Sequence, residues 1–421
     1  MTNSVQPVKP GLHTSEFHPT VRVQDDLFRF TNGTWIDSFE MPADQSTYGS
    51  FMLLRDLSEE RVKAIIEDAA ANPKPGVSQQ IGDMYASFMN EQRANELGVA
   101  PIAADLKKIS ELGSIAEVTE LLGELSAAGS DVLFGMYIDN DPGNPERYLV
   151  NIYQGGLGLP DEAYYHEEKH AEVRDAYVPF IAEMLELAGW SAADADAAAH
   201  HIYNFELALS KHHWTVVESR DAEKVYNLRK FDELQKLSGT FDWNLWLKGA
   251  GLGKNVLEES VVMMPSFLEG LDSVYTEANL ESIKLWIAFH LINDMAPYLH
   301  EPLINARFAF YGRRLTGQPE MRARWKRGVQ AVEGALGEAV GEVYVERHFP
   351  QAAKAQMAKD PDSKRIELDG YYQLNDLGKL DKSKPQFVDK KALDLVKTVR
   401  NDADAIQKMV TLLAKRTGLE A

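Results

Sequence analysis

One stretch of the sequence has the residue types and the spacing of a catalytic metal site. His166, Glu167 and His170 form the pattern H-E-x-x-H. On a helix, residues four positions apart lie on one face, so both imidazoles could bind a single Zn²⁺ ion. Glu167 could then remove a proton from a zinc-bound water, which is the chemistry of a metallopeptidase.

The residues around this motif favour an ordinary surface helix instead. A zinc helix must be buried enough to hold its ligands rigidly, yet both intervening residues, Glu168 and Lys169, are charged. Further charges flank the motif at Asp161, Glu162, Glu172, Arg174 and Asp175. A third ligand could come from Glu183 or Glu186, but on a continuous helix Glu183 would lie about 20 Å from His170. We therefore expect a solvated helix that begins near Asp161.

The other residues that could do chemistry show no productive spacing. His201 and His212 share a predicted helix face but lie three turns apart, about 16 Å. Gly155-Gly-Leu-Gly158 follows a predicted strand but lacks the lysine and the spacing of a phosphate-binding loop, so we expect a tight strand-to-helix turn. No G-x-S-x-G pattern of a serine hydrolase occurs. The sequence therefore assigns no catalytic residue, no cofactor-binding residue and no metal ligand, and no cofactor is expected in this chain.

The composition excludes several classes of function. The 421 residues include no cysteine, which rules out disulfides, thiolate zinc sites and a cysteine nucleophile. The net charge of −20 argues against nucleic acid or an anionic membrane as a partner, because both require a basic face. No apolar run reaches the ~18 residues of a membrane span, and the N-terminus shows no apolar signal segment. We expect a cytoplasmic globular protein.

The elements that would position these residues are mostly helices. Apolar residues recur at three- and four-residue spacing through most of the first 350 residues. This spacing predicts helices over residues 57–71, 78–97, 114–127, 191–214, 276–295, 303–315 and 318–344. Ser114 and Glu117 have the form of a capping box at the start of one of them. One strand pair is predicted over residues 132–138 and 147–153, joined by a turn-rich segment. The predicted fold class is mainly α, a large multi-helix domain with one small antiparallel β-hairpin.

The C-terminal part of the sequence differs from the first 350 residues in net charge and in the spacing of its apolar residues. From residue 351 onward there are 14 basic and 11 acidic residues, whereas the first 350 residues contain 30 basic and 53 acidic ones. Residues 359–390 are polar and weakly periodic, so we predict a linker there, followed by one helix over residues 392–416.

Several runs of residues, taken together and in order, resemble a known family. They are residues 25–35 with Pro42 and 48–51, 154–160 with Tyr164 and Tyr165, 218–221 with Tyr226 and Asn227, 308–312 with Leu315 and Gly317, and 324–326 leading into 336–337 and 341–345. In this order they resemble the N-terminal, non-catalytic, helical half of the neprilysin-like zinc metallopeptidases. The resemblance covers residues 25–357 and predicts three segments: an N-terminal extension over 1–24, the helical cap domain over 25–357, and an unrecognised linker and helix over 358–421.

The resemblance also implies a role and its limits. In this family the zinc helix, a glutamate ligand and the substrate-binding strand lie in a C-terminal catalytic domain, and nothing after Met357 resembles that domain. The H-E-x-x-H motif falls where the family has an ordinary helix, so no catalytic or metal residue is carried over to this chain. The helical half of the family encloses a peptide-binding cavity over the catalytic domain. Apolar residues that would lack this cover here are Phe28, Phe30, Trp35, Phe39 and Phe51, which must be buried by the C-terminal segment, by a partner, or left as an exposed patch.

Three hypotheses for the function follow. The leading one is a cap domain that binds peptides, either with a separate catalytic metallopeptidase chain or as a peptide-binding remnant. The second is a self-contained zinc peptidase that uses His166, Glu167 and His170. The third is a scaffold or relic without activity.

Overall fold

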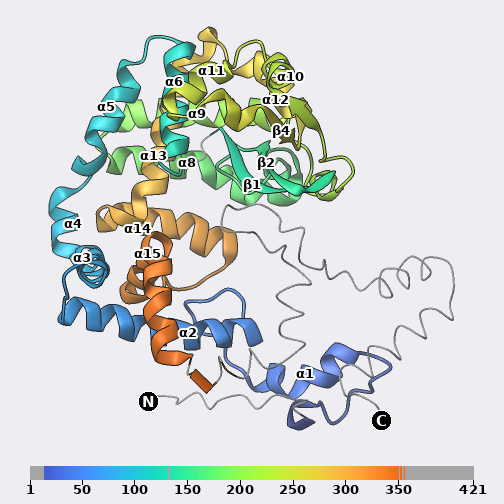
Figure 1. The fold of residues 1–421 in the computed structure, drawn as a ribbon, viewed down its shortest axis with the longest axis vertical. Helices are drawn as coiled ribbons and strands as arrows, with labels where there is room; N and C mark the ends of the chain where they lie inside the picture. The colour runs from blue at the N-terminus through green and yellow to red at the C-terminus, as the bar shows by residue number, and fades with distance from the viewer. Residues whose placement is uncertain (1–13, 131–132, 350, 353–354, 356–421) are drawn as a thin grey trace. The chain divides into compact units, whose positions relative to one another are not determined.

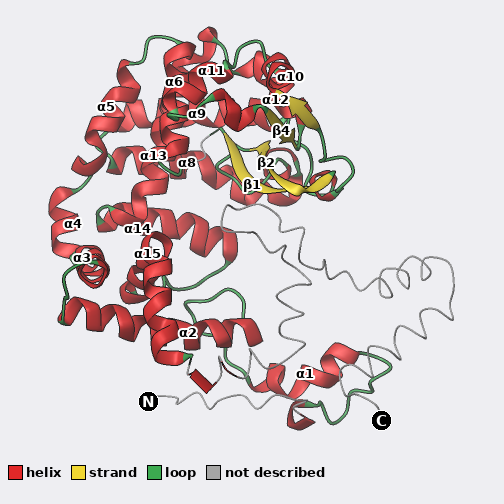
Figure 2. Ribbon diagram, in the orientation of Figure 1, coloured by secondary structure: helices red, strands yellow, loops and turns green. Residues whose placement is uncertain are grey.

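The computed structural model describes residues 14–130, 133–349, 351–352 and 355. Helices make up most of this part of the chain and one small sheet accompanies them (Figures 1 and 2), so the prediction of a mainly α fold is confirmed. The chain divides into one unit from Met1 to Val340 and another from Gly341 to Ala421. The fold and sites below belong to the first unit. The predicted segment boundaries at 24/25 and 357/358 stay predictions, and the predicted linker and last helix lie outside the described residues.

The α-helices are α1 (Leu27–Ser38), α2 (Ser50–Ala71), α3 (Val77–Met89), α4 (Glu91–Leu97), α5 (Ala103–Glu111), α6 (Ile115–Ala127), α7 (Ala163–His166), α8 (Ala171–Leu187), α9 (Ala192–Ser210), α10 (Phe231–Leu237), α11 (Trp243–Gly249), α12 (Pro265–Val274), α13 (Leu280–Met295), α14 (Glu301–Arg307) and α15 (Arg324–His348). A π-helix, η8 (Phe308–Leu315), directly continues α14. The strands are β1 (Phe134–Asp141), β2 (Asn144–Gln154), β3 (Leu228–Lys230) and β4 (Glu259–Val262).

The predicted hairpin is part of a larger sheet. β1 and β2 pair in antiparallel register, with Phe134 opposite Gln154, and the predicted turn-rich segment contracts to Pro142 and Gly143. β2 also pairs with β4 in parallel, and β4 pairs with β3 in antiparallel register, so the sheet has the order β1-β2-β4-β3. β3 and β4 have 3 and 4 residues, which is too short for an alternating pattern to identify them from sequence.

The predicted helices form, with changes at their ends that have local causes. The segment predicted over 78–97 is two helices, because Asn90 leaves the helical conformation and its side chain caps α4 by accepting from the Arg93 N–H at 3.0 Å. Ser114 caps α6 as predicted, accepting from the Glu117 N–H at 3.2 Å. The Glu117 carboxylate accepts from the N–H of Gly113, one residue before the position of a standard capping box. The helix predicted from residue 318 begins only at Arg324.

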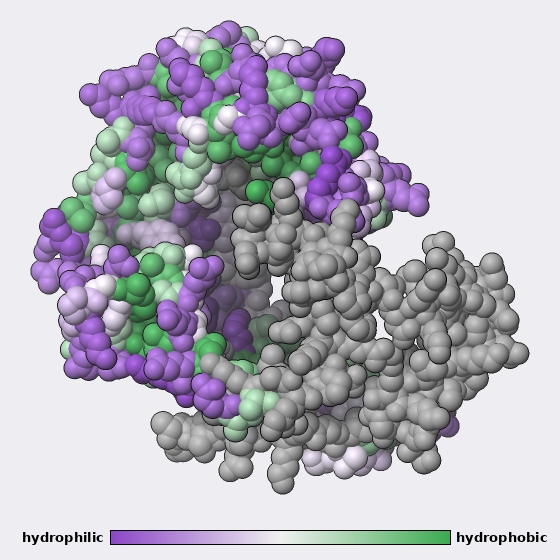
Figure 3. Space-filling view, viewed as in Figure 1, coloured by the Kyte–Doolittle hydropathy of each residue, from purple (hydrophilic) through white to green (hydrophobic). Residues whose placement is uncertain are grey.

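The core of this unit is apolar and rich in aromatic side chains. Tyr177 of α8 and Trp286 and Phe289 of α13 are fully buried, and they pack with residues of α6, α9, α11 and the sheet in one continuous cluster. By contrast, the surface over α6, α10 and α11, at the top of Figure 3, is largely hydrophilic. The helices therefore bury one face and expose the other, as their apolar spacing predicts.

Helices α6 and α11 approach so closely that glycine is required at their contact. A Cβ on Gly123 of α6 would lie 2.1 Å from the backbone oxygen of Trp246, and a Cβ on Gly249 of α11 would lie 1.9 Å from the backbone oxygen of Glu120. Backbone atoms cannot rotate away as a side chain can, so the two helices must separate to admit a methyl group.

We predict that Gly123→Ala destabilises the protein by roughly 1–3 kcal/mol, the usual cost of overpacking a core. Gly334→Ala in α15 is the matched control, because no atom lies within 4 Å of its Cβ position; removing a helical glycine there should stabilise by about 0.5–1 kcal/mol. Urea unfolding of both variants measures the difference. Equal stabilities for the two variants would contradict the close approach of α6 and α11.

Candidate functional site

The H-E-x-x-H motif does not lie on one continuous helix. α7 ends at His166, Glu167 is extended with φ −89° and ψ 139°, and a 3-10 turn from Glu168 to His170 precedes α8. The prediction of a continuous helix beginning near Asp161 is therefore wrong at Glu167. Because of this break, the two imidazoles do not have the helical i, i+4 relation by which an H-E-x-x-H motif binds zinc.

The side chains of the motif make separate contacts. His166 Nε2 lies 2.9 Å from Ser210 Oγ on α9, and the His170 ring stacks on Tyr164 with the ring centres 3.9 Å apart. Glu167 accepts a hydrogen bond from Lys169, and this contact lowers the pKa of the Glu167 carboxyl. Within the described part of the chain, no three His, Asp or Glu side chains come together in a way that could hold a metal ion.

The glycine loop over residues 155–160 is a partly buried structural element. Its carbonyl groups point at side-chain donors: Gly155 O accepts from His213 Nε2 at 3.0 Å, Gly156 O from Trp286 Nε1 at 3.0 Å and Gly158 O from Tyr311 Oη at 2.9 Å. Gly156 has φ +89°, a conformation that glycine adopts without strain. A phosphate-binding loop must direct backbone N–H groups at its ligand, whereas this loop uses its carbonyls to bind the core. It is longer than the tight turn predicted.

The glycine loop is linked through Tyr165 to a buried carboxylate, Glu206. The sequence patterns did not identify this residue as important. Glu206 of α9 is 0% exposed. It accepts from Tyr165 Oη at 2.6 Å and Tyr177 Oη at 3.2 Å, and its carboxylate lies 2.9 Å from His290 Nε2. The available signal was its position between Ile202 and Leu209 on the apolar face of α9, where a lone acid needs several donors.

The electrostatics of this cluster fit a structural role. Burial, followed by the charge of Glu206, raises the pKa of the Tyr165 and Tyr177 phenols well above the usual value. Both phenols therefore remain O–H donors over the ordinary pH range. Since the cluster lies inside the core, it holds the glycine loop and does not present an acid or a nucleophile to a substrate.

Two of the hollows among the described residues of the first unit have polar side chains in their lining. The smaller, about 290 Å³, is lined by the glycine loop with His213 and Trp214. The larger, about 1000 Å³, lies between α3, α14, η8 and α15 and is here called the arginine cleft because Arg307, Arg322 and Arg327 line it. None of the residues singled out as candidates in the sequence lines the arginine cleft. No helix among the described residues is both long and apolar enough to cross a lipid bilayer.

Comparisons with known proteins agree on one family. The model for the N-terminal part of peptidase family M13 matches residues 23–359. Human membrane metallo-endopeptidase-like 1 is 25% identical over 93% of this chain and 53% of its own length, and the neutral endopeptidase of Lactobacillus helveticus is 27% identical over 79% and 51%. A crystal structure of the Mycobacterium tuberculosis zinc metalloprotease ZMP1 with an inhibitor superposes with a TM-score of 0.77 at 38% identity, over 87% of this chain and 56% of that chain. The chain thus spans about half the length of these relatives.

We predict that His213 makes folding stability depend on pH. Burial lowers the pKa of His213 from 6.5 to about 4, so the imidazole stays neutral in the folded protein while the unfolded chain takes up a proton below pH 6.5. The contribution of the neutral His213 imidazole to the free energy of unfolding is therefore complete above pH 6.5 and is lost as the pH falls towards 4. This linkage removes about 2 kcal/mol between pH 7 and pH 5.

The measurement is urea unfolding at pH 7 and pH 5 for the wild type and His213→Gln. The variant keeps an N–H donor for Gly155 but does not titrate, so it should lose less stability between the two pH values. His201→Gln is the control, because this histidine is exposed and should leave the wild-type pH dependence unchanged. An identical loss in wild type and His213→Gln would contradict the assignment.

We also predict that the motif binds no zinc. His166 and His170 make separate contacts with Ser210 and Tyr164, so purified protein should retain only sub-stoichiometric zinc after dialysis, and His166→Ala should not change that content. Elemental analysis by mass spectrometry measures it. One equivalent of zinc in the wild type that disappears in both His166→Ala and His170→Ala would overturn this interpretation.

Proposed function

Because this chain belongs to peptidase family M13, as the N-terminal domain of a neprilysin-like metallopeptidase, we propose that it acts as the cap of such an enzyme. In this proposal the domain packs against a zinc-bearing catalytic half, supplied by a separate chain, and encloses peptide substrates over the catalytic site. The observation that carries the proposal is the match of 87% of this chain to 56% of the ZMP1 chain. The likeness includes the sequence, at 38% identity, and not the fold alone, and a fold by itself would not imply a function.

The exposed apolar residues of α1 and α2 support a packing surface of this kind. Phe28 is 69% exposed and Phe51 is 83% exposed, and Leu27 and Leu54 beside them in sequence are also exposed. Large exposed apolar side chains on two helices that follow each other in the chain favour a protein partner, since water solvates them poorly. These residues would supply a contact with the catalytic half.

Of the five apolar residues named from the sequence, two are exposed in the structure. Trp35 and Phe39 stack on each other with ring centres 4.7 Å apart, and Phe39 also contacts Tyr48 at 4.4 Å. Phe30 packs against Phe17 at 4.8 Å. These three side chains are partly covered within the N-terminal segment itself, which leaves Phe28 and Phe51 for a partner.

The relatives support an enclosing role that opens and closes. ZMP1 of M. tuberculosis has been solved with an inhibitor and in an open state, the latter at 41% identity to this chain. Opening implies two halves that separate and return. A contact surface with a few exposed aromatic side chains is compatible with such a reversible contact. Interfaces between domains resemble transient protein–protein interfaces.

We predict that this chain co-purifies with a neprilysin-type catalytic half when the two are coexpressed, and that peptide hydrolysis requires both. Changing Phe28 and Phe51 together to Ser should weaken this association by about tenfold or more, because central aromatic contacts dominate interfaces. Size-exclusion chromatography and hydrolysis of a short quenched-fluorescent peptide measure the two effects.

Val217→Ser is the matched control, because Val217 is 79% exposed but lies on another segment of the chain. It should leave association unchanged. A stable chain that binds neither a catalytic half nor any peptide would refute the proposal and favour the scaffold hypothesis.

A further inference from the structure

The arginine cleft has a charge opposite to that of the chain. Arg307, Arg322 and Arg327 line it together with apolar and neutral residues, and no Asp or Glu is among its lining residues. The chain as a whole has 64 acidic against 44 basic residues. Arg322 is paired with Glu59, so Arg307 and Arg327 are the two cations of the cleft that a ligand would neutralise.

Arg327 supplies a guanidinium that is only partly satisfied. Its Nε donates to the backbone oxygen of Arg322 at 3.1 Å, which fixes the side chain in place. Its Nη1 is buried and has no hydrogen-bond partner among the described residues. Burial and the neighbouring charge of Arg324 lower the pKa of Arg327. A buried donor without a partner destabilises the folded protein, and a bound acceptor would remove that cost.

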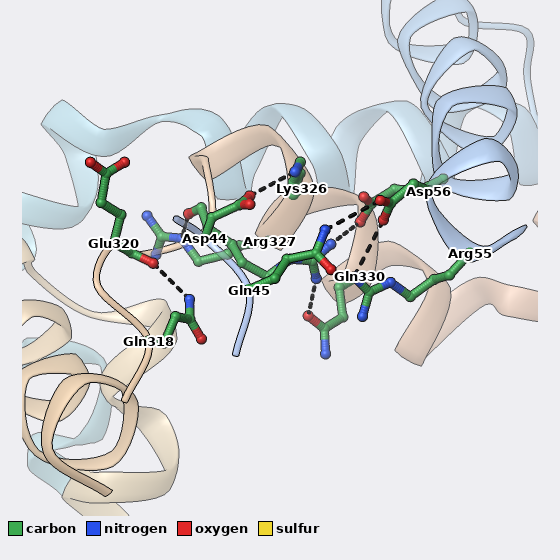
Figure 4. A network of polar contacts seen from close by, with 11 residues as sticks. Asp44, Gln45, Arg55, Asp56, Gln318, Glu320, Lys326, Arg327 and Gln330 are labelled. Carbon is green, nitrogen blue, oxygen red and sulfur yellow. Dashed lines mark hydrogen bonds and ion pairs between the residues drawn. The ribbon is translucent and has the colours of Figure 1, made fainter. Parts of the chain in front are cut away.

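Arg322 lies beside it and is fixed from the opposite side. Its Nη2 pairs with Glu59 of α2 and its Nη1 lies 3.4 Å from Gln330 Oε1, while its Nε is buried without a partner in the described structure. Figure 4 shows how the surrounding contacts hold this region: Lys326 reaches Asp44, and Gln45 reaches Asp56. The guanidinium is therefore positioned before any ligand arrives.

Arg307 completes the set from the end of α14. Its Nε donates to the backbone oxygen of Asn293 at 3.0 Å, and the guanidinium lies 5.2 Å from the Tyr311 ring centre. Within the described residues, neither Arg307 nor Arg327 makes an ion pair with a carboxylate. These two cations thus keep their capacity for an anion.

The rest of the lining is apolar and aromatic. Met84 and Phe88 of α3 and Phe308 of η8 line the cleft, and Tyr298 packs edge-on against Phe88 with ring centres 6.1 Å apart. Aromatic rings and a methionine favour an apolar ligand body, and guanidinium groups favour a planar carboxylate that can accept two hydrogen bonds. A strongly hydrated inorganic anion would leave the apolar wall unused.

We propose that the arginine cleft binds a carboxylate carried on an apolar body, with Arg327 and Arg307 as the principal contacts. Two sources share this chemistry: a free aromatic or aliphatic acid, and the C-terminal residue of a peptide. The inference concerns this chain alone and does not depend on assembly with a catalytic half.

The test is isothermal titration of the full chain with N-acetyl-phenylalanine and with its neutral amide. The acid should bind and the amide should bind at least about tenfold more weakly, because charge-assisted hydrogen bonds are lost. A tripeptide ending in phenylalanine, with a free or an amidated C-terminus, distinguishes the two sources. Binding of the tripeptide acid alone assigns the cleft to chain ends, and binding of both acids assigns it to the shared carboxylate.

Arg327→Gln should weaken binding of the acid by about tenfold or more, and Arg307→Gln, a variant on a different element, should also weaken it. Arg327→Lys should restore part of the affinity. Arg93→Gln is the control, since Arg93 is exposed on α4 and its ion-pair partner is Glu96. Thermal unfolding of each variant verifies folding, and the Arg307 variant provides the answer if Arg327→Gln does not fold.

Several outcomes would overturn the proposal. Equal affinity for acid and amide would show that the arginines do not recognise charge. Unchanged binding in folded Arg307→Gln and Arg327→Gln would place the ligand elsewhere. Inorganic phosphate binding as tightly as the acid would show that the apolar wall contributes nothing, and no binding of any acid would end the assignment.

Discussion

The buried carboxylate of Glu206 is the constraint on which much of the helical unit depends. A charge inside a core is tolerated only when donors surround it, and here the donors come from α7, α8 and α13. The Tyr165 hydroxyl that donates to Glu206 also accepts from the Leu159 N–H at 3.2 Å, so the same cluster fixes the glycine loop between β2 and α7. Moving any one of these elements would leave the charge without a partner, which couples sheet, loop and helices into one structure.

Much of this fold follows from local patterns in the sequence, and the exceptions have physical causes. The amphipathic helices, the Ser114 cap and the β1–β2 hairpin depend on short-range periodicity and capping, which a sequence displays directly. β3 and β4 are defined by pairing with distant β2, so nothing local reveals them. Glu206 is a lone acid on an apolar helix face. Its role is not visible locally because its hydrogen-bond donors lie up to 84 residues away in the sequence. The break at Glu167 was invisible because the flanking charges suit a helix start as well as a turn.

The candidate site that the sequence suggests, the H-E-x-x-H motif, is not the site that the structure suggests, the arginine cleft. The H-E-x-x-H motif has the residue types of a metal centre, but its side chains contact neighbouring residues. The arginine cleft has no sequence motif and forms where α3, α14, η8 and α15 meet. Composition also misleads here: an acidic chain contains a hollow lined only by positive charge among its ionisable residues. The spacing of residues in the sequence indicates which side chains share one face of one helix. A cleft depends instead on which helices pack together, and spacing does not show this.

The ion pair between Glu59 and Arg322 has a consequence for biosynthesis. Its partners are 263 residues apart, so α2 leaves the ribosome long before the segment that it binds. At ordinary elongation rates of ~5–20 residues per second, that interval is about 13 to 50 seconds. During this time α2 has α3 beside it but lacks Arg322, and the exposed Phe51 at its start is available to other nascent chains. The contact between α2 and Arg322 therefore forms only late in synthesis, and chaperones that shield apolar segments are expected to act on the N-terminal helices first.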